Sequence, residues 1–305
     1  MVIFLTGEND FEIKRTLDAI VLKFVQKFGA NGVERVAGED TEPAALSQLL
    51  QGASLFAQQR LVVLRDAADN KQLWDALGDW VERVPAETTL IIVEPKPDKR
   101  SRTFKSLTKH ADVRECKALS ERELTSWVVN CAKKLGGSIA PSQANYLVMQ
   151  VGTDQWRLQH EIEKLVSYDP TVTKESIDEL VETSSEGNVF ALLDAALSGN
   201  LPRTEELLNQ LKTNEDPYKF FGLLSSQVHT LALVAHAGTR TPDEIAKASG
   251  THPFVVRKAK PIVQRLGTQK LRSIVHDVAQ CDTQLKTTGQ DPWRLIELAL
   301  GKLAT

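Results

Sequence analysis

Apolar residues in the first third of the chain follow two different patterns. Short, nearly uninterrupted apolar runs predict buried strands, and they occur at Val2–Leu5, Arg60–Leu64 and Leu90–Val93, with a further candidate at Gly32–Val36. Between these runs the apolar residues recur at every third or fourth position, which predicts amphipathic helices. Strands without alternation that are separated by helices indicate a mostly parallel sheet covered on both faces. The expected helices are Glu12–Phe28, Pro43–Gln51 and Lys71–Val84.

From about Lys117 onward the strand pattern disappears and a helical pattern replaces it. Ser120 followed by Glu123 is typical of a capping box, in which the two side chains satisfy the first free amides of a helix. This helix is expected to end at Gly136. We therefore expect a compact helical unit over residues 118–183. Further helices of this unit are expected to begin at Pro141, Thr153 and Thr173.

Glu186–Asn188 is expected to interrupt the chain before a second helical region. The loops of this region are short and contain glycine or proline, as in helix bundles. The sequence thus predicts the fold class α/β plus all-α, with an α/β domain at 1–117, a small helical domain at 118–183 and a larger helical domain at 184–305. The helices expected in the last domain are Val189–Leu197, Thr204–Leu211, Pro217–Ala237, Pro242–Ser249, Pro253–Leu266, Thr268–Leu285 and Pro292–Leu303.

The composition is that of a globular protein, with 42% hydrophobic and 25% charged residues. The net charge of -3 means that any contact with nucleic acid must come from a local patch. Cys116, Cys131 and Cys281 are far apart and form no zinc or disulfide pattern. The run Met1–Gly7 lacks the basic lead of a signal peptide, and about 18 consecutive apolar residues, enough to span a membrane, occur nowhere. We expect a soluble, cytoplasmic protein without membrane contacts.

Gly7 follows the first expected strand, where a phosphate-binding loop would begin. Such a loop needs a second glycine, a lysine and a serine or threonine at fixed offsets, because backbone amides hold the phosphates and the hydroxyl holds magnesium. Those positions are occupied by Glu12, Ile13 and Lys14. The glutamate would repel phosphate, and the isoleucine cannot replace the lysine. We therefore expect the chain to bind no nucleotide or other cofactor.

Other catalytic patterns are also missing. The sequence has neither a G-x-S-x-G turn nor an H-E-x-x-H helix, and His229 and His236 are seven positions apart, too far for a metal-binding pair on one helix. Acidic residues are scattered over polar helix faces, so no general acid and base can be singled out. We expect no catalytic residues and no metal ion, and hence a chain that is not itself an enzyme.

Leu55 and Phe56 are large apolar residues in a polar setting between an expected helix and the strand that begins at Arg60. One interpretation is that they pack on the sheet. The other is that they form an exposed wedge that inserts into a pocket of a partner, since paired aliphatic and aromatic anchors are typical of interface hot spots. Each such side chain contributes about 1.5–3 kcal/mol when it is fully buried.

The region from Lys96 to Arg114 contains seven basic and two acidic residues. It is either a solvated helix face or a surface that contacts DNA phosphates, and in the second case binding would be salt-sensitive. The candidate DNA-contacting residues are Lys99, Arg100, Arg102 and Lys105.

A second candidate DNA-binding feature lies in the last third of the chain. Thr241–Gly250 predicts a short helix and a glycine turn, and Phe254–Lys260 predicts a basic helix after it. This arrangement resembles a helix-turn-helix. The alternative function is therefore a helix-turn-helix DNA-binding regulator.

Gln51–Leu64 resembles the clamp-binding element, and the following strand, of the delta subunits of bacterial DNA polymerase III clamp loaders. Val93–Ser101 resembles a strand and charged turn of the same AAA+-like family, although Pro97 stands where a leucine is usual. Further segments match in the same order, and the degraded phosphate loop agrees with them. These segments are Glu161–Leu165, Asn188–Ala195 and Gly250–Phe254.

The resemblance implies an AAA+-like α/β domain, a helical lid and a helical collar that joins five subunits in a ring. It implies that Leu55 and Phe56 bind and open the sliding clamp (the beta subunit) for loading at primed DNA, while neighbouring subunits bind ATP. The other loader subunits are expected to bind through the collar, and primed DNA within the assembled complex. The chain would then work inside the DNA polymerase III holoenzyme by binding energy alone.

Overall fold

Five parallel strands form the centre of the amino-terminal part in the computed structural model, which describes residues 1–51, 59–182, 185–251 and 253–303. Their order is β2-β3-β4-β1-β5, and every neighbouring pair is parallel. The three inner strands carry the apolar runs seen in the sequence, because both of their faces are covered. The strands are β1 (Val2–Thr6), β2 (Val33–Ala37), β3 (Arg60–Arg65), β4 (Thr88–Val93) and β5 (Asp112–Glu115).

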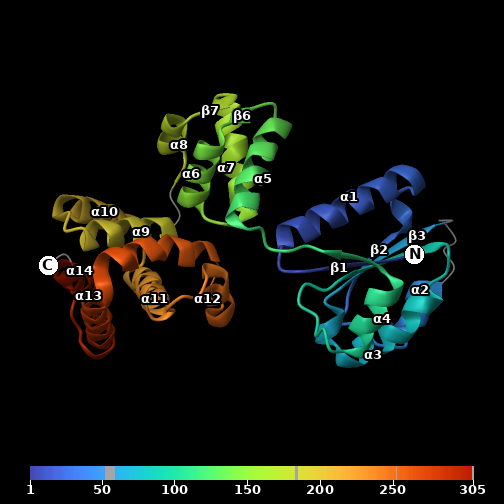
Figure 1. Cartoon of the computed structure of the whole chain (residues 1–305). Coiled ribbons are helices and arrows are strands. Elements are labelled where there is room, and N and C mark those ends of the chain that lie inside the picture. Colours follow the sequence, from blue (N-terminus) through green and yellow to red (C-terminus); the bar gives the residue numbers. More distant parts are fainter. Residues whose placement is uncertain (52–58, 183–184, 252, 304–305) are drawn as a thin grey trace. The chain divides into compact units, whose positions relative to one another are not determined.

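Helices cover both faces of this sheet (Figure 1). The helix α1 packs on one face through residues such as Ile13 and Leu17. The helices α2, α3 and α4 pack on the opposite face, with Leu50, Leu77 and Leu107 in its core. Each of these side chains is at most 5% exposed, so each contributes about 1.5–3 kcal/mol to folding. The four helices are α1 (Asp10–Phe28), α2 (Ala45–Gln51), α3 (Lys71–Trp80) and α4 (Arg102–His110).

Four helices and a small strand pair follow. The expected capping box is present, since the Glu123 amide donates to Ser120 Oγ at 3.4 Å and the Ser120 amide to Glu123 Oε2 at 2.8 Å. The expectation that no strand follows Lys117 is wrong, because two-residue segments form a parallel ladder. Such short strands leave no periodic pattern to detect. The elements are α5 (Glu121–Lys134), β6 (Ser138–Ile139), α6 (Pro141–Val151), α7 (Gln155–Tyr168), β7 (Thr171–Val172) and α8 (Lys174–Leu180).

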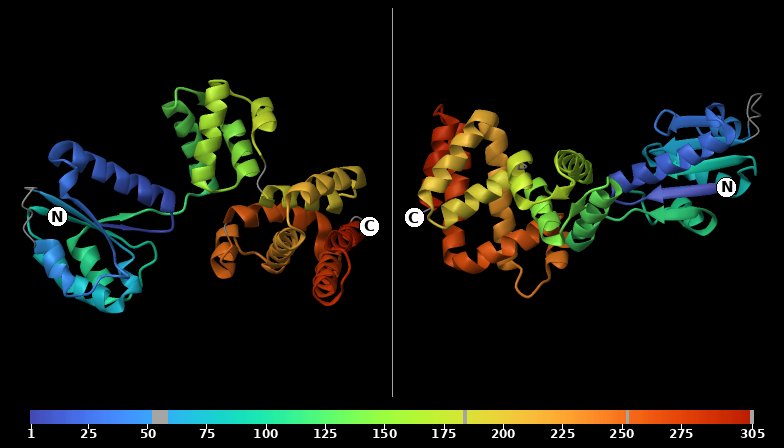
Figure 2. Two further views of the ribbon diagram at one scale, coloured as in Figure 1. Left: turned by 180° about the vertical axis from the view of Figure 1, so that it is seen from behind. Right: turned by 90° about the horizontal axis from the view of Figure 1, so that it is seen from above.

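The last described region is helical (Figure 2). Its helices share one large apolar core. The break expected at Glu186–Asn188 is wrong, because α9 begins at Ser185 and includes these residues. Glycine and asparagine are tolerated there because the first-turn amides have no partner within the helix. The expected division at Gly267 is confirmed by its φ of 73° inside α13. The helices are α9 (Ser185–Leu197), α10 (Leu201–Asn214), α11 (Pro217–His236), α12 (Pro242–Ser249), α13 (Pro253–Thr287) and α14 (Pro292–Leu303).

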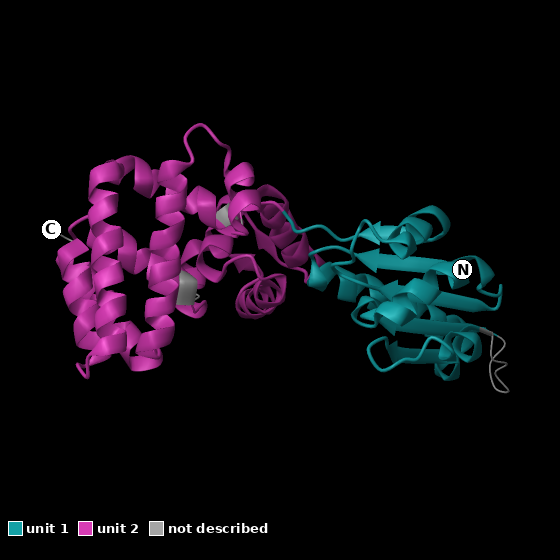
Figure 3. Cartoon of the chain, turned by 90° about the horizontal axis from the view of Figure 1, so that it is seen from below, with its two compact units in different colours: residues 1–119 teal, residues 120–305 magenta. Residues whose placement is uncertain are grey.

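The chain divides into two compact units, Met1–Leu119 and Ser120–Thr305 (Figure 3). The first unit ends at Leu119, two residues after the boundary expected at residue 117. The further division of the helical part at residue 183 stays a prediction. Within the described ranges, no helix combines the length and apolar character that crossing a bilayer would need.

Candidate functional site

The turn between β1 and α1 is closed by backbone hydrogen bonds at the carboxyl edge of the sheet. The Gly7 amide donates to the Pro95 carbonyl at 3.0 Å, and the Asn9 amide donates to the Cys116 carbonyl at 3.1 Å. The Cys116 amide in turn donates to Thr6 O at 2.7 Å. A phosphate-binding loop must aim its amides at the ligand, and two amides of this turn are already occupied by carbonyls.

Gly7 itself shows how tightly the turn is packed. Its φ is 119°, a conformation that side chains rarely adopt, and a Cβ placed on it would lie 2.1 Å from the Cys116 carbonyl oxygen. Glycine therefore serves a close approach between two backbone segments, where a phosphate-binding loop would use it to approach a ligand.

The amino end of α1 does not favour an anion. The Asn9 side chain accepts a hydrogen bond from the Glu12 amide at 3.0 Å, and Asp10 and Glu12 place negative charge in the first turn. Negative side chains at this end already stabilise the positive pole of the helix. Lys14 forms an ion pair with Asp18 at 3.1 Å along the same helix. Lys14, which stands where a phosphate loop has its hydroxyl, thus has another partner.

A pocket of about 490 Å³ remains beside this turn, lined by Glu8 and three lysines among other residues. Two of these lysines are paired with one carboxylate, since Lys99 Nζ lies 3.3 Å from Glu115 Oε1 and Lys117 Nζ 3.4 Å from Glu115 Oε2. The hydrogen bond from Lys99 and the charge of Lys117 lower the pKa of the Glu115 carboxyl. Much of the positive charge of this pocket is therefore compensated within it.

Two acidic residues follow β3 and β4 on the same edge. Glu94 is 7% exposed and accepts a hydrogen bond from the Ala68 amide at 2.9 Å. Burial, with help from the nearby charges of Asp66 and Asp69, raises the pKa of the Glu94 carboxyl. Asp66 has a left-handed φ of 53°. In the part of the chain that the structure describes, no group of acidic, histidine or cysteine residues is arranged to hold a metal ion.

Leu55 and Phe56, the expected clamp-binding residues, lie outside the described residues. The described chain on both sides of them is firmly held. In α2, Leu46 and Leu50 are each 1% exposed, and the Leu50 carbonyl accepts a hydrogen bond from Thr88 Oγ1 at 3.1 Å. Beyond the segment, β3 begins at Arg60. Both attachment points belong to the core of the α/β unit.

The four candidate DNA-contacting residues do not form one free basic surface. Arg100 binds its neighbour Asp98 through Nε at 3.0 Å, and Lys99 is held by Glu115. Arg102 reaches α3, where its Nη2 lies 2.7 Å from Asp79 Oδ1. Within the described residues, Lys105 is exposed and makes no ion pair. These residues lie in α4 and the loop before it, and the structure supplies most of them with acidic partners.

The two histidines of α11 and the helix-turn-helix candidate have ordinary places in the helical region. His229 and His236 are exposed on α11, and His236 Nδ1 lies 2.9 Å from the Ala232 carbonyl oxygen. In the helix-turn-helix candidate, Arg257 Nε lies 3.4 Å from Glu121 Oε2, and Lys258 donates to the Met149 carbonyl at 3.2 Å. The first basic residues of α13 are thus engaged within the protein, whereas a recognition helix would present them to DNA.

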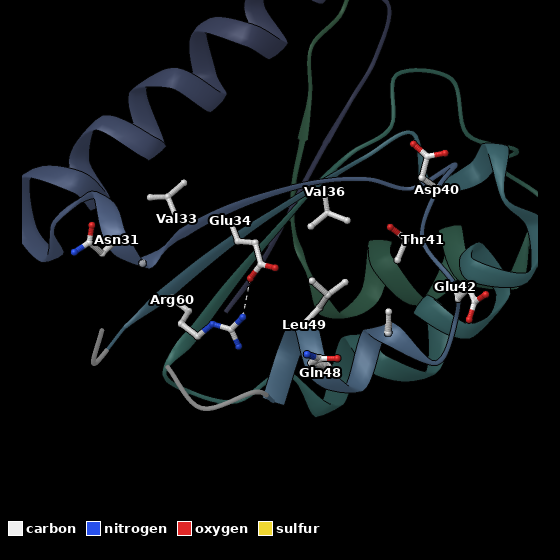
Figure 4. A pocket seen from close by; sticks show the side chains of 12 residues that line it. Asn31, Val33, Glu34, Val36, Asp40, Thr41, Glu42, Gln48, Leu49 and Arg60 are labelled. Atoms are coloured by element: carbon white, nitrogen blue, oxygen red, sulfur yellow. Dashed lines mark hydrogen bonds and ion pairs between the residues drawn. The ribbon is translucent and has the colours of Figure 1, made fainter. Parts of the chain in front are cut away.

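Sequence reasoning did not find a groove of about 860 Å³ beside β2 (Figure 4). It is lined by both apolar and charged residues of β2, α2 and the loop that joins them. Only the mixed polar and apolar character of Val33–Ala37 could have signalled it, because that pattern is typical of a sheet edge.

The geometry defines a class: an α/β unit with a five-stranded parallel sheet, whose β1–α1 turn is closed by backbone hydrogen bonds, followed by a helical unit. A family model described as DNA polymerase III, delta subunit matches residues 4–117. The model for the C-terminal domain of the same subunit matches residues 186–303. The chain belongs to the family of DNA polymerase III delta subunits, which are proteins of DNA replication.

Two relatives agree with this assignment. DNA polymerase III subunit delta of Bacillus subtilis is 29% identical over 286 residues, covering 87% of this chain and 82% of that protein. The solved structure of the Bacillus subtilis DNA clamp loader delta protein is 24% identical, with a TM-score of 0.75 over 99% of this chain and 95% of that chain. The expected fold class, α/β plus all-α, is confirmed. The alternative helix-turn-helix regulator receives no support.

Proposed function

We propose that the chain is a clamp-loader delta subunit that binds a sliding DNA clamp and opens it for loading at primed DNA, without hydrolysing ATP itself. The observation that carries this proposal is the closed β1–α1 turn in a delta-family fold. The Gly7 and Asn9 amides are bonded to carbonyls, so this turn offers neither amide to the phosphates of a nucleotide. Its work must therefore come from binding energy.

In the proposed mechanism Leu55 and Phe56 enter a pocket of the clamp and favour its open form. A ligand shifts a conformational equilibrium only by its difference in affinity for the two forms. Two anchors that each contribute about 1.5–3 kcal/mol on full burial provide energy of the size that such a shift requires. Neighbouring loader subunits, which would bind ATP, would control when these residues reach the clamp.

The attachment of this segment supports the proposal. The helix α2, which precedes it, is fixed to the sheet by Leu46 and Leu50, and the segment ends at a central strand. A binding segment held at both ends by a packed core loses less conformational entropy on binding than a free peptide does. It also couples the bound clamp mechanically to the whole α/β unit.

The helical region and the basic residues near α4 also have roles in the proposed function. The region 184–305 would be the collar that joins the other loader subunits, and Leu201 and Leu298, which are 56% and 53% exposed, are apolar side chains available on it. Lys105 would contact DNA phosphates in the assembled loader, whereas Lys99, Arg100 and Arg102 would first have to leave their acidic partners. The site of action would be the cytoplasm.

A double substitution, Leu55→Ala with Phe56→Ala, tests the proposal directly. If these residues form the wedge, the variant should lose roughly 2–5 kcal/mol of affinity for purified clamp, measured by surface plasmon resonance, and keep its melting temperature. If they are core residues, the variant should instead lose several kcal/mol of stability.

The matched control is Leu22→Ala with Phe28→Ala, which removes a leucine and a phenylalanine that are 58% and 42% exposed on α1. This control should bind the clamp as the unmodified protein does. A lower melting temperature with unchanged clamp affinity in the Leu55 and Phe56 variant would refute the wedge.

A further inference from the structure

The edge strand β2 borders a groove that no described part of the chain fills. Within the described residues β2 pairs with β3 alone, so its other side is the edge of the sheet. The groove has a volume of about 860 Å³ and lies between β2, α2 and the loop that contains Thr41 (Figure 4). Unpaired backbone groups along a sheet edge are a template for an added strand.

The groove has an apolar floor. Val36 of β2 and Leu49 of α2 both line it, and both are only half-buried although they touch the core on this face of the sheet. Alternate residues of a strand point to the same face, so every second side chain of an added strand would lie over this floor. The floor therefore suits an extended peptide with apolar residues at every second position.

The walls of the groove are acidic. Glu34, Asp40 and Glu42 line it, against one basic residue, Arg60, which gives -3 + 1 = -2 for the lining. Arg60 is largely buried, with 16% of its side chain exposed, and its Nη2 lies 2.8 Å from Glu34 Oε2. The uncompensated charge is therefore that of Asp40 and Glu42 at the carboxyl end of β2. A partner with basic residues at that end would be complementary.

The strand at the opposite edge of the sheet, β5, is less suited to pairing with an added strand than β2. The strand β5 exposes Asp112, Arg114 and Glu115, with Val113 half-buried, and Arg114 Nη2 is paired with Asp112 Oδ2 at 2.8 Å. Charged side chains along an edge discourage strand addition. The strand β2 carries two of them, Glu34, which is paired with Arg60, and the exposed Arg35. Only β2 combines a free edge, an apolar floor and unbalanced charge among the described strands.

We propose that β2 binds an extended, basic peptide segment of a partner protein as a sixth strand of the sheet. Backbone hydrogen bonds along Val33–Ala37 supply affinity, and Val36 and Leu49 select the apolar positions. Asp40 and Glu42 select lysine or arginine at one end. The five residues of β2 span roughly 16 Å, so a segment of about five residues is sufficient. This inference does not depend on clamp binding through Leu55 and Phe56.

The test uses the full chain and two labelled seven-residue probe peptides, one alternating lysine with valine and one alternating glutamate with valine. The lysine peptide should bind with a salt-dependent affinity, measured by fluorescence anisotropy, and the glutamate peptide should not. Hydrogen exchange should show new protection of the β2 amides on binding. Absence of binding, or binding without protection of β2, would overturn the proposal.

The double variant Asp40→Lys with Glu42→Lys should weaken the lysine peptide roughly two- to thirty-fold, because two exposed charge pairs are lost. The control, Glu179→Lys with Glu205→Lys, makes the same charge change at exposed positions of the helical unit and should bind normally. Equal loss in both variants would show a nonspecific charge effect and reject the site. Sedimentation velocity of the protein alone should show no association through this edge, since a dimer that Asp40→Lys with Glu42→Lys disrupts would mean that a second copy is the occupant.

Discussion

Replacing Gly7 with alanine probes the closed turn at the carboxyl edge of the sheet. The new Cβ would lie 2.1 Å from the carbonyl oxygen and 2.7 Å from the carbonyl carbon of Cys116. Both are backbone atoms, so no side-chain rotation can relieve the contact. The end of β5 must therefore move away from β1, or the turn must change its conformation.

The magnitude follows from the interactions that this movement disturbs. A non-glycine residue at positive φ costs about 1–3 kcal/mol. Moving Cys116 weakens two hydrogen bonds. One runs from the Cys116 amide to the Thr6 carbonyl at 2.7 Å, and the other from the Asn9 amide to the Cys116 carbonyl at 3.1 Å. Each contributes about 0.5–1.5 kcal/mol net. Together the substitution should cost roughly 2–6 kcal/mol, a large part of the 5–15 kcal/mol that is typical of a whole domain.

Gly29→Ala is the matched control in the same unit. Gly29 also has a positive φ, 83°, but a Cβ on it would meet no atom within 4 Å. The Gly29→Ala variant should lose about 1–3 kcal/mol of stability, because it gains backbone strain and no steric clash. Native-state hydrogen exchange of the β1 and β5 amides reports the local opening free energy in the full chain. Equal losses in both variants, or protection of β5 that is unchanged in Gly7→Ala, would refute the close-packing argument.

Three further outcomes are expected. Titration calorimetry with magnesium and ATP should give no saturable isotherm, because the amides of the β1–α1 turn are already bonded; a one-to-one isotherm in the micromolar range would contradict this. Because burial raises the pKa of Glu94, the folded state binds more protons between the ordinary and the raised pKa, so this residue lowers stability as pH rises through that interval. Glu94→Gln keeps the acceptor for the Ala68 amide and should raise the melting temperature at neutral pH, with a gain that shrinks on acidification; a gain independent of pH would argue against the buried charge. Ser120→Ala removes a capping box and should cost about 0.5–2 kcal/mol of α5 stability by hydrogen exchange, whereas exposed Ser126→Ala should change little.

The parts of the fold that sequence patterns predicted are those in which burial alone decides the structure. The strands β1, β3 and β4 are covered on both faces, so their residues had to be apolar over the whole run. The edge strand β5 has one valine among charged residues, and its place is decided by pairing with β1, which no local pattern encodes. The same holds for the ladder of Ser138–Ile139 with Thr171–Val172, where long-range pairing overrides a helical context.

Only part of the candidate site could be predicted from the sequence. The sequence predicted that a phosphate loop is missing, because Glu12 and Ile13 have the wrong chemistry at fixed offsets. The groups that close the turn could not be predicted. Pro95 and Cys116 follow two strands far along the chain, and they contribute backbone atoms, which carry no sequence signature. Likewise the acidic partners of Arg102 and Lys99 come from other elements, so a count of basic residues overstated the free positive charge.

A closed carboxyl edge changes which surfaces of a parallel sheet remain for function. Open α/β sheets bind ligands at the carboxyl ends of their strands, and here that edge is occupied by hydrogen bonds between β1, β4 and β5. The edge of β2 is another boundary of the sheet, and within the described residues it has a partner strand on one side only. This edge suits a macromolecular partner better than a small ligand, because it offers backbone groups for an added strand.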